Sequence, residues 1–431
     1  MMDKPIKLQD FQITLQTRNT KGKIKYVHFK RDNSPIYIKL CSRSGSRFDP
    51  EGKEGLAHFV EHVVLNGTEK FIGKRELSQA LDNIGGSYSA QTGYEYTCFN
   101  FLIANKSSLP LISDVSNQIL RKPSLLEDKI SSEKKVVQSE ISSKIDDKKR
   151  VLSNGVKSLI YGDRSIARSP SGSKESIELI NREDILTHLE HTLPNYMTVV
   201  SCGDCDITDI INNFDDSIPY CEETIINDDR DRQHSDVKHG VTKMRDQKLI
   251  YCSFAFPTCS LDSKDWLPLN IISTYLGKGR SSLLKEILRY KNNLIYSTSS
   301  GNDYFSDSGY FFIEASMKKE NLEPATNKIV DMLTIFLNNG IEDNDLSVVK
   351  NKIINSSIIS TQTVQSWVNT HFYRQLLIRD SNYYYNDFLN DVKNITKEQI
   401  KEVANKYLTK DKMHLYAVGN LEISEIENII H

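Results

Sequence analysis

Apolar residues between positions 56 and 63 recur at the spacing of one face of an α-helix, at i, i+3, i+4 and i+7. They are Leu56, Phe59, Val60 and Val63. The pattern predicts a helix whose apolar stripe packs into a core, with Asn66-Gly67 as its stop. The opposite face carries His58, Glu61 and His62, so two imidazoles and a carboxylate point away from that core.

One stretch of the chain is repeated near its other end. Residues 197–207 (MTVVSCGDCDI) are echoed by residues 413–423 (MHLYAVGNLEI), 216 positions later. Each follows a helix-like segment, 180–193 in the first case and 395–408 in the second, where Thr396 opens the helix in a capping box. The sequence therefore predicts two similar halves of roughly 215 residues, each containing helices and strands.

The two halves are separated by a strongly acidic segment. Residues 215–236 contain eight acidic side chains against two arginines, a composition typical of an exposed linker. The expected domains are an N-terminal domain at 1–214, a linker at 215–240 and a homologous C-terminal domain at 241–431.

Composition excludes several classes of protein. With 431 residues, 38% hydrophobic and 26% charged positions and a net charge of −2, the chain resembles an ordinary soluble globular protein. Nothing in that balance favours nucleic acid or an anionic membrane surface. No apolar run reaches the length of a membrane span, and the first residues lack the apolar core of a secretory signal, so we expect a cytoplasmic protein.

The seven cysteines, an odd number, do not indicate a disulfide framework. Cys202 and Cys205 form a single C-x-x-C, which is found in redox pairs and in metal sites. No partner Cys/His pair has suitable spacing, so the pattern favours core or strand-end cysteines.

The polar face of the first helix has the spacing H-x-x-E-H, the inverted form of the zinc-protease signature H-E-x-x-H. Two imidazoles at i and i+4 can reach one ion, and Glu61 lies close enough to take a proton from a metal-bound water. Such a site needs a third protein ligand. The best candidate is Glu140, on a predicted helix where Glu133 shares its stripe with apolar residues. The alternative is that these polar groups are solvated surface residues.

The duplication provides an internal control on this interpretation. Residues 136–141 (VVQSEI) match residues 348–353 (VVKNKI), which places Lys352 where the first half has Glu140. The H-x-x-E-H helix is replaced there by residues 265–270 (DWLPLN). All the candidate ligands are therefore missing together from one half, as expected of a metal site and not of independent surface residues.

Residues 55–68 (GLAHFVEHVVLNGT), together with Glu140 in its V-V-x-x-E helix, resemble the pitrilysin family of zinc metallopeptidases. The resemblance covers nearly the whole chain. It implies an α+β fold with two homologous domains, each a mostly antiparallel sheet covered by helices. Together they would form half of a clamshell that encloses peptides.

Carried over residue by residue, the resemblance implies that His58, His62 and Glu140 bind one Zn²⁺ per chain. Glu61 would be the general base and Glu133 a supporting carboxylate in the second shell. In the second half, Arg289 and Tyr296 resemble the family's pair that stabilises the developing oxyanion, although Ile295 replaces the usual small residue. Their alternative roles are an exposed helix-end arginine and an ordinary strand aromatic.

Residues 85–92 (GGSYSAQT) resemble the stretch where the family presents an edge strand to substrate. A peptide added there would form main-chain hydrogen bonds regardless of its sequence. The expected substrate-binding residues are Ser87, Tyr88, Ser89 and Ala90. Ser89 stands where an asparagine is common, and the segment is also compatible with an ordinary strand entered through a Gly-Gly turn.

These patterns predict a zinc endopeptidase acting on peptides or unfolded segments inside an enclosed chamber. Because one chain holds half of the clamshell, we expect a homodimer, or a heterodimer with a related subunit, in which the partner supplies Arg289 and Tyr296. The alternative is a catalytically idle binding or assembly subunit of a heterodimeric peptidase. The sequence leaves open whether the substrate is a precursor to be matured or a peptide to be cleared.

Overall fold

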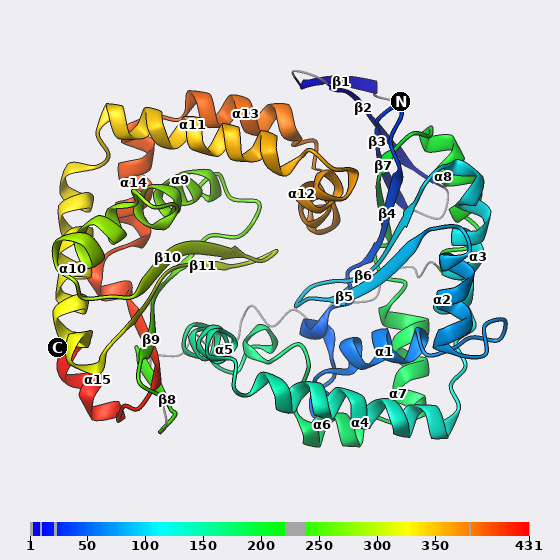
Figure 1. Cartoon of the computed structure of the whole chain (residues 1–431), viewed down its shortest axis with the longest axis horizontal. Helices are drawn as coiled ribbons and strands as arrows, with labels where there is room; N and C mark the ends of the chain where they lie inside the picture. Colours follow the sequence, from blue (N-terminus) through cyan, green and yellow to red (C-terminus); the bar gives the residue numbers. More distant parts are fainter. Residues whose placement is uncertain are drawn as a thin grey trace. The chain divides into compact units, whose positions relative to one another are not determined.

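Two β-sheets, each covered by helices, organise the chain (Figure 1). The structure is a computed structural model that describes residues 3–8, 11–20, 24–219, 238–245, 247–378 and 381–430. The first unit comprises Met1–Ser142, Arg168–Asp228 and Ile358–Tyr385. The second comprises Ser143–Ala167, Asp229–Ser357 and Asn386–His431. Most of the predicted linker at 215–240 lies outside the described residues.

The sheet of the first unit has the strand order β1-β2-β3-β7-β4-β6-β5. Its strands are β1 (Asp3–Leu8), β2 (Phe11–Asn19), β3 (Lys25–Lys30), β4 (Ile36–Ser42), β5 (Ser87–Thr92), β6 (Thr97–Ile103) and β7 (Thr198–Gly203). Neighbours run antiparallel except β3 and β7, which are parallel. β5 is one of the two edge strands, because among the described strands it pairs with β6 alone.

The helices of the first unit contribute to the same buried core as its sheet. Phe59 and Val63, for example, lie in one hydrophobic cluster with Ile38 of β4 and Phe101 of β6. They are α1 (Leu56–Val64), α2 (Lys74–Asp82), α3 (Leu109–Arg121), α4 (Glu127–Lys144), α6 (Lys174–Leu179), α7 (Arg182–Thr187), α8 (Ile207–Phe214) and α12 (Val364–Leu377). The helical segment predicted at 180–193 is present, because α7 continues directly into a π-helical turn at His188–Thr192. Asn181 accepts hydrogen bonds from the N–H groups of Glu183 and Asp184, so this capping box starts α7 only at Arg182.

The second unit repeats the central part of this topology. Its strand order is β10-β11-β9-β12-β8, formed by β8 (His239–Lys243), β9 (Ile250–Thr258), β10 (Ser297–Tyr304), β11 (Gly309–Met317) and β12 (His414–Gly419). β12 lies between a parallel and an antiparallel neighbour, as β7 does in the first sheet. The predicted α+β class and the duplication of sheet-and-helix domains are therefore confirmed.

The helices of the second unit include α14, which starts after the capping box of Thr396 and Gln399 as predicted. They are α5 (Lys148–Tyr161), α9 (Trp266–Gly277), α10 (Leu322–Asn339), α11 (Asp343–Ser360), α13 (Tyr385–Asn394), α14 (Lys397–Tyr407) and α15 (Ile423–Ile430). No helix in the described part of the chain is both long and apolar enough to cross a membrane.

Each unit contains one helix from the other half of the sequence. α5 packs against β12 and β9 of the second sheet, and α12 packs against β7 and β4 of the first. Trp367 of α12 is fully buried with its ring 5.6 Å from that of Phe29, and Asn369 accepts a hydrogen bond from Lys39. The units are therefore not continuous segments, and they differ by this exchange from the domain boundaries predicted at 214 and 241.

Replacing Trp367 with alanine should lower the free energy of unfolding of the first unit by about 3–5 kcal/mol, because it removes a fully buried aromatic side chain. Hydrogen exchange should then show lost protection in β3, β4 and β7, with β9 and β12 unchanged. Ile359→Ala is the control, since that side chain is 74% exposed and its loss should change stability by less than about 0.5 kcal/mol. Loss of protection confined to the second sheet would contradict the assignment of α12.

Candidate metal centre

The start of α1 is determined by a glycine and a buried carboxylate. Gly55 has φ +93°, and a Cβ at this position would lie 2.7 Å from the carbonyl oxygen of Ser171, so no other residue fits without strain. The Asp49 carboxylate accepts hydrogen bonds from the N–H groups of Gly55 (2.8 Å) and Ala57 (2.9 Å). Burial raises the pKa of Asp49 to about 8, although the N–H donors at the helix end act in the opposite direction.

Three potential metal ligands converge between α1 and α4. One ligand atom from each of His58, His62 and Glu140 lies within 4.8 Å of the others, and no other group of three His, Cys, Asp or Glu side chains does so among the described residues. Glu140 Oε1 is 3.9 Å from His58 Nε2, and Glu140 Oε2 is 3.5 Å from His62 Nε2. Ligand atoms on a tetrahedral zinc are separated by roughly 3.3 Å, so small side-chain movements would complete the site.

Glu133 and Asn66 orient one of the imidazoles. Glu133 Oε1 lies 2.9 Å from His62 Nδ1, and its other oxygen accepts a hydrogen bond of 3.1 Å from the amide of Asn66. Because an ionised carboxylate can only accept, Nδ1 of His62 carries the proton and Nε2 presents its lone pair towards Glu140. A lone pair facing a carboxylate at 3.5 Å requires a cation or a proton between them. The donor set therefore fits a divalent metal ion.

Glu61 lies on the same helix, with its side chain largely buried. Its Oε2 accepts a hydrogen bond of 2.5 Å from the hydroxyl of Thr92, the last residue of β5. Sequence reasoning identified neither Thr92 nor Asp49, and it read Asn66 only as a helix stop. Asn66 lies just after α1 and contacts Glu133, 67 positions away, so no local spacing in the sequence indicates that contact.

Comparison with known proteins assigns both halves of the chain to one peptidase family. Residues 28–172 match the insulinase family (peptidase family M16), and residues 180–353 match the peptidase M16 inactive domain. The chain belongs to peptidase family M16. The suspected resemblance to pitrilysin-like and insulysin-like peptidases is thereby confirmed.

Several M16 relatives align with this chain over most of their own length. A protein of Mycobacterium tuberculosis named uncharacterized zinc protease is 24% identical over 375 residues, which are 85% of this chain and 84% of the relative. One with the same designation from Bacillus subtilis is 22% identical over 393 residues, covering 89% and 94%. The crystal structure of a protease from Helicobacter pylori superimposes with a TM-score of 0.85 at 20% identity, covering 94% of this chain and 99% of that one.

The expected substrate strand of this M16 chain is at the sheet edge. Ser87 and Ser89 are exposed on β5, while Tyr88 and Ala90 turn towards the apolar core. The hydroxyl of Ser89 accepts a hydrogen bond of 3.2 Å from Asn100 of β6. An edge strand next to α1 has free main-chain groups to offer, and this geometry is compatible with the predicted role.

Arg289 and Tyr296 belong to the second unit of the M16 chain, whereas His58, His62 and Glu140 belong to the first. Arg289 is exposed on the helical turn Lys285–Lys291, and the Tyr296 side chain is 52% exposed just before β10. Ile295, the departure from the family pattern, is buried in the core of its unit.

Cys202 and Cys205 are core cysteines, as the sequence favoured. Burial raises the pKa of both thiols to about 12, which leaves little reactive thiolate at neutral pH. Cys205 Sγ lies 3.7 Å from Nε2 of the buried His28.

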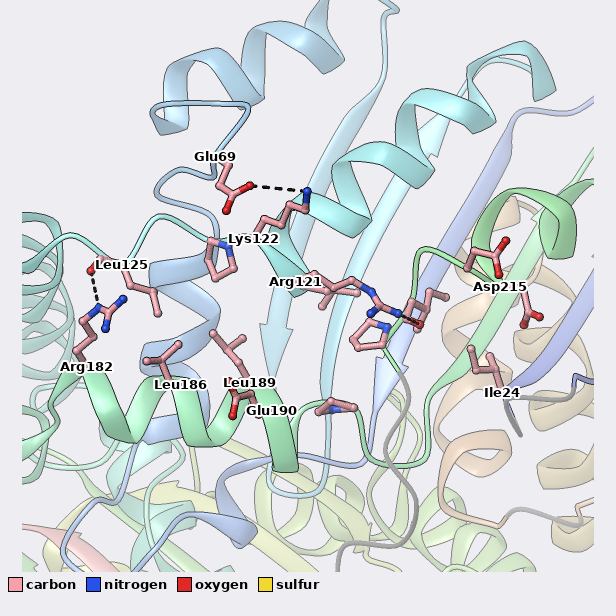
Figure 2. Close-up of a pocket in the computed structure, with 16 residues that line it drawn as sticks. Ile24, Glu69, Arg121, Lys122, Leu125, Arg182, Leu186, Leu189, Glu190 and Asp215 are labelled. Carbon is pink, nitrogen blue, oxygen red and sulfur yellow. Dashed lines mark hydrogen bonds and ion pairs between the residues drawn. The ribbon is translucent and has the colours of Figure 1, made fainter.

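A cavity of about 620 Å³ in the first unit is separate from the metal ligands. Figure 2 shows its basic side chains turned to partners on the wall, where Arg121 donates to the carbonyl of Ile218 and Arg182 to that of Leu125. Its lining residues are Ile24, Glu69, Leu120, Arg121, Lys122, Pro123, Leu125, Arg182, Leu186, Leu189, Glu190, Pro194, Asp215, Asp216, Ile218 and Pro219. None of these residues belongs to the metal centre.

Replacing Asp49 with alanine should lower the free energy of unfolding of the metal-free protein by about 1–2 kcal/mol, because two N–H groups at the start of α1 lose their acceptor. Thermal unfolding would measure the change. Asp49→Asn keeps one acceptor and should lose less, and Asp82→Ala, at an exposed position, should leave stability unchanged. Equal stability of the Asp49→Ala variant and the wild type would show that the carboxylate does not hold the helix.

Proposed function

We propose that this chain is a zinc-dependent endopeptidase that cleaves peptides or unfolded segments. The observation that carries the proposal is the convergence of His58, His62 and Glu140, with the His62 lone pair directed at a carboxylate. M16 relatives named zinc proteases support the choice of metal and of reaction. The alternative of an idle assembly subunit is not favoured by any contact in the described residues.

Each residue of the centre has a distinct part in this proposal. His58, His62 and Glu140 would hold one zinc ion, and Glu133 with Asn66 would keep His62 in the ligating tautomer. Zinc bound there would polarise the attacking water and lower its pKa towards about 7. Glu61 would take the proton of that water on its carboxylate, which the hydroxyl of Thr92 orients through Oε2. The same carboxyl group would then return the proton to the leaving amine.

The substrate would bind as an additional strand at β5. Main-chain groups of the edge residues Ser87 to Ala90 would pair with the extended peptide and bring its scissile bond to the metal. This mode reads backbone geometry, so it suits unfolded segments of varied sequence. Arg289 and Tyr296 of a partner chain would donate to the developing oxyanion, and two such chains would enclose the reaction in a chamber.

The purified protein should contain about one zinc ion per chain and hydrolyse a quenched-fluorescence peptide library. Glu140→Ala should lower zinc affinity roughly 100-fold or more by removing a ligand. Glu61→Gln should keep its zinc and lose activity by about 10²–10⁴-fold, because the amide cannot accept the proton. Elemental analysis and peptide turnover would measure the two effects.

Two exposed glutamates serve as controls for these variants. Glu127 lies on the same helix as Glu140, and Glu51 precedes α1. The variants Glu127→Ala and Glu51→Gln should both behave as the wild type. Full occupancy in Glu140→Ala would refute the ligand assignment. A zinc-loaded wild type that turns over no peptide would favour the idle subunit.

Assembly can be tested by complementation between two inactive variants. If partner chains supply Arg289, a mixed dimer of Glu61→Gln and Arg289→Ala chains contains one intact site of two. Random exchange in an equal mixture makes about half of the dimers mixed, so mixing should restore about a quarter of wild-type activity. The measurement is peptide turnover before and after exchange of subunits, with sedimentation velocity to establish the dimer. A monomeric active enzyme, or no recovery in verified mixed dimers, would exclude the shared site.

A further inference from the structure

Thr92 connects the proposed substrate strand to the proposed general base. It is the last residue of β5, and its hydroxyl donates to Glu61 Oε2 at 2.5 Å. Hydrogen bonds from a hydroxyl to a carboxylate at about 2.5–2.7 Å are among the stronger side-chain interactions in proteins. Side chains alternate along a strand, so Thr92 shares a face with Tyr88 and Ala90, which turn towards the core that contains α1.

The turn that follows Thr92 is held in place by backbone hydrogen bonds. The N–H of Gly93 donates to the carbonyl of Tyr96 at 2.8 Å, which closes the hairpin between β5 and β6. The carbonyls of Gly93 and Tyr94 accept from the N–H groups of Ser46 (3.1 Å) and Arg47 (2.8 Å). A Cβ at Gly45 would lie 2.3 Å from the backbone nitrogen of Tyr96, so the backbone at residues 45–47 packs closely against this turn.

A buried ion pair anchors the same turn. Arg47 Nη1 lies 2.9 Å from Glu95 Oε1, and the two side chains are 4% and 0% exposed. The other Glu95 oxygen accepts a hydrogen bond of 3.1 Å from the hydroxyl of Tyr373 on α12. Breaking a buried pair of this kind is costly, so the hairpin has little freedom to move. The Thr92 hydroxyl is therefore presented to Glu61 from a fixed position.

Glu61 needs such a partner because its side chain has three rotatable bonds. A base is efficient only when the oxygen that accepts the proton lies within hydrogen-bonding reach of it. One oxygen of Glu61 accepts a hydrogen bond from Thr92, which restricts the orientations available to the carboxylate. A third group that orients the base is the general pattern in sites of this type.

We propose that Thr92 is a positioning residue, whose hydroxyl holds Glu61 in its reactive orientation and ties that orientation to the strand that binds the peptide. This inference rests on the proposed function. It assigns the end of the edge strand a second task besides main-chain pairing. The distance between the peptide carbonyl and the base is then set by one rigid hairpin.

The test compares Thr92→Val, which has nearly the same shape without the hydroxyl, with Thr92→Ser, which keeps the hydroxyl. We expect Thr92→Val to lower kcat by about 10- to 100-fold with KM and zinc content unchanged. Thr92→Ser should stay within about threefold of the wild type, because it retains the donor. High-resolution crystal structures of the metal-free proteins should show one Glu61 rotamer in the wild type and in Thr92→Ser, and several in Thr92→Val.

Thr97→Val is the matched control. Thr97 faces Thr92 across the hairpin, but its hydroxyl donates to the carbonyl of Ser44. The control should lower stability without changing kcat or the Glu61 rotamer. Equal loss of kcat in Thr97→Val, or a single Glu61 rotamer in Thr92→Val with unchanged kcat, would overturn the inference. An inactive wild type would refute the proposed function, and the metal-free structures would still decide the role of Thr92.

Discussion

The whole centre depends on two carboxylates approaching opposite nitrogens of one imidazole. Glu133 binds Nδ1 of His62, and Glu140 faces Nε2 of the same ring. With the proton placed on Nδ1, the contact between the Nε2 lone pair and the Glu140 carboxylate is repulsive until a positive charge enters between them. This electrostatic demand explains why α1 and α4 must be held at a defined separation. The buried side chains Phe59, Val63, Ile130 and Val137 provide that packing.

The duplicated topology separates what the fold needs from what the chemistry needs. Both sheets place one strand, β7 or β12, between a parallel and an antiparallel neighbour. In each sheet the antiparallel neighbour, β4 or β9, precedes an α-helix in the chain, α1 or α9. Yet the second unit has Lys352 in the stretch that matches Glu140, and the ammonium group of Lys352 donates to the carbonyl of Lys278. The same scaffold thus folds with a cation bonded to the main chain in place of an acidic ligand. The metal ligands are therefore not required for the fold.

The supports of α1 come from the segment just before it and from two more distant parts of the chain. Asp49 binds its first N–H groups, Glu133 orients its second histidine, and Thr92 holds its glutamate. A helix with these three attachments has little freedom to rotate or slide. Catalytic groups usually need alignment within a fraction of an ångström, and a rigid helix anchored at its start and along its polar face can provide it.

The sequence alone determined the duplicated α+β architecture and pointed to the candidate ligands and to the helix that carries two of them. Periodicity and the H-x-x-E-H spacing are local properties that can be read from the chain, and so is the absence of the candidate ligands from the second half. Only the tertiary structure decided that α5 and α12 each pack on the sheet formed mainly by the other half of the sequence, since an amphipathic pattern does not specify which sheet buries it. It also decided the contact of Thr92 with Glu61, because a hydrogen bond between residues 31 positions apart leaves no periodic trace in the chain.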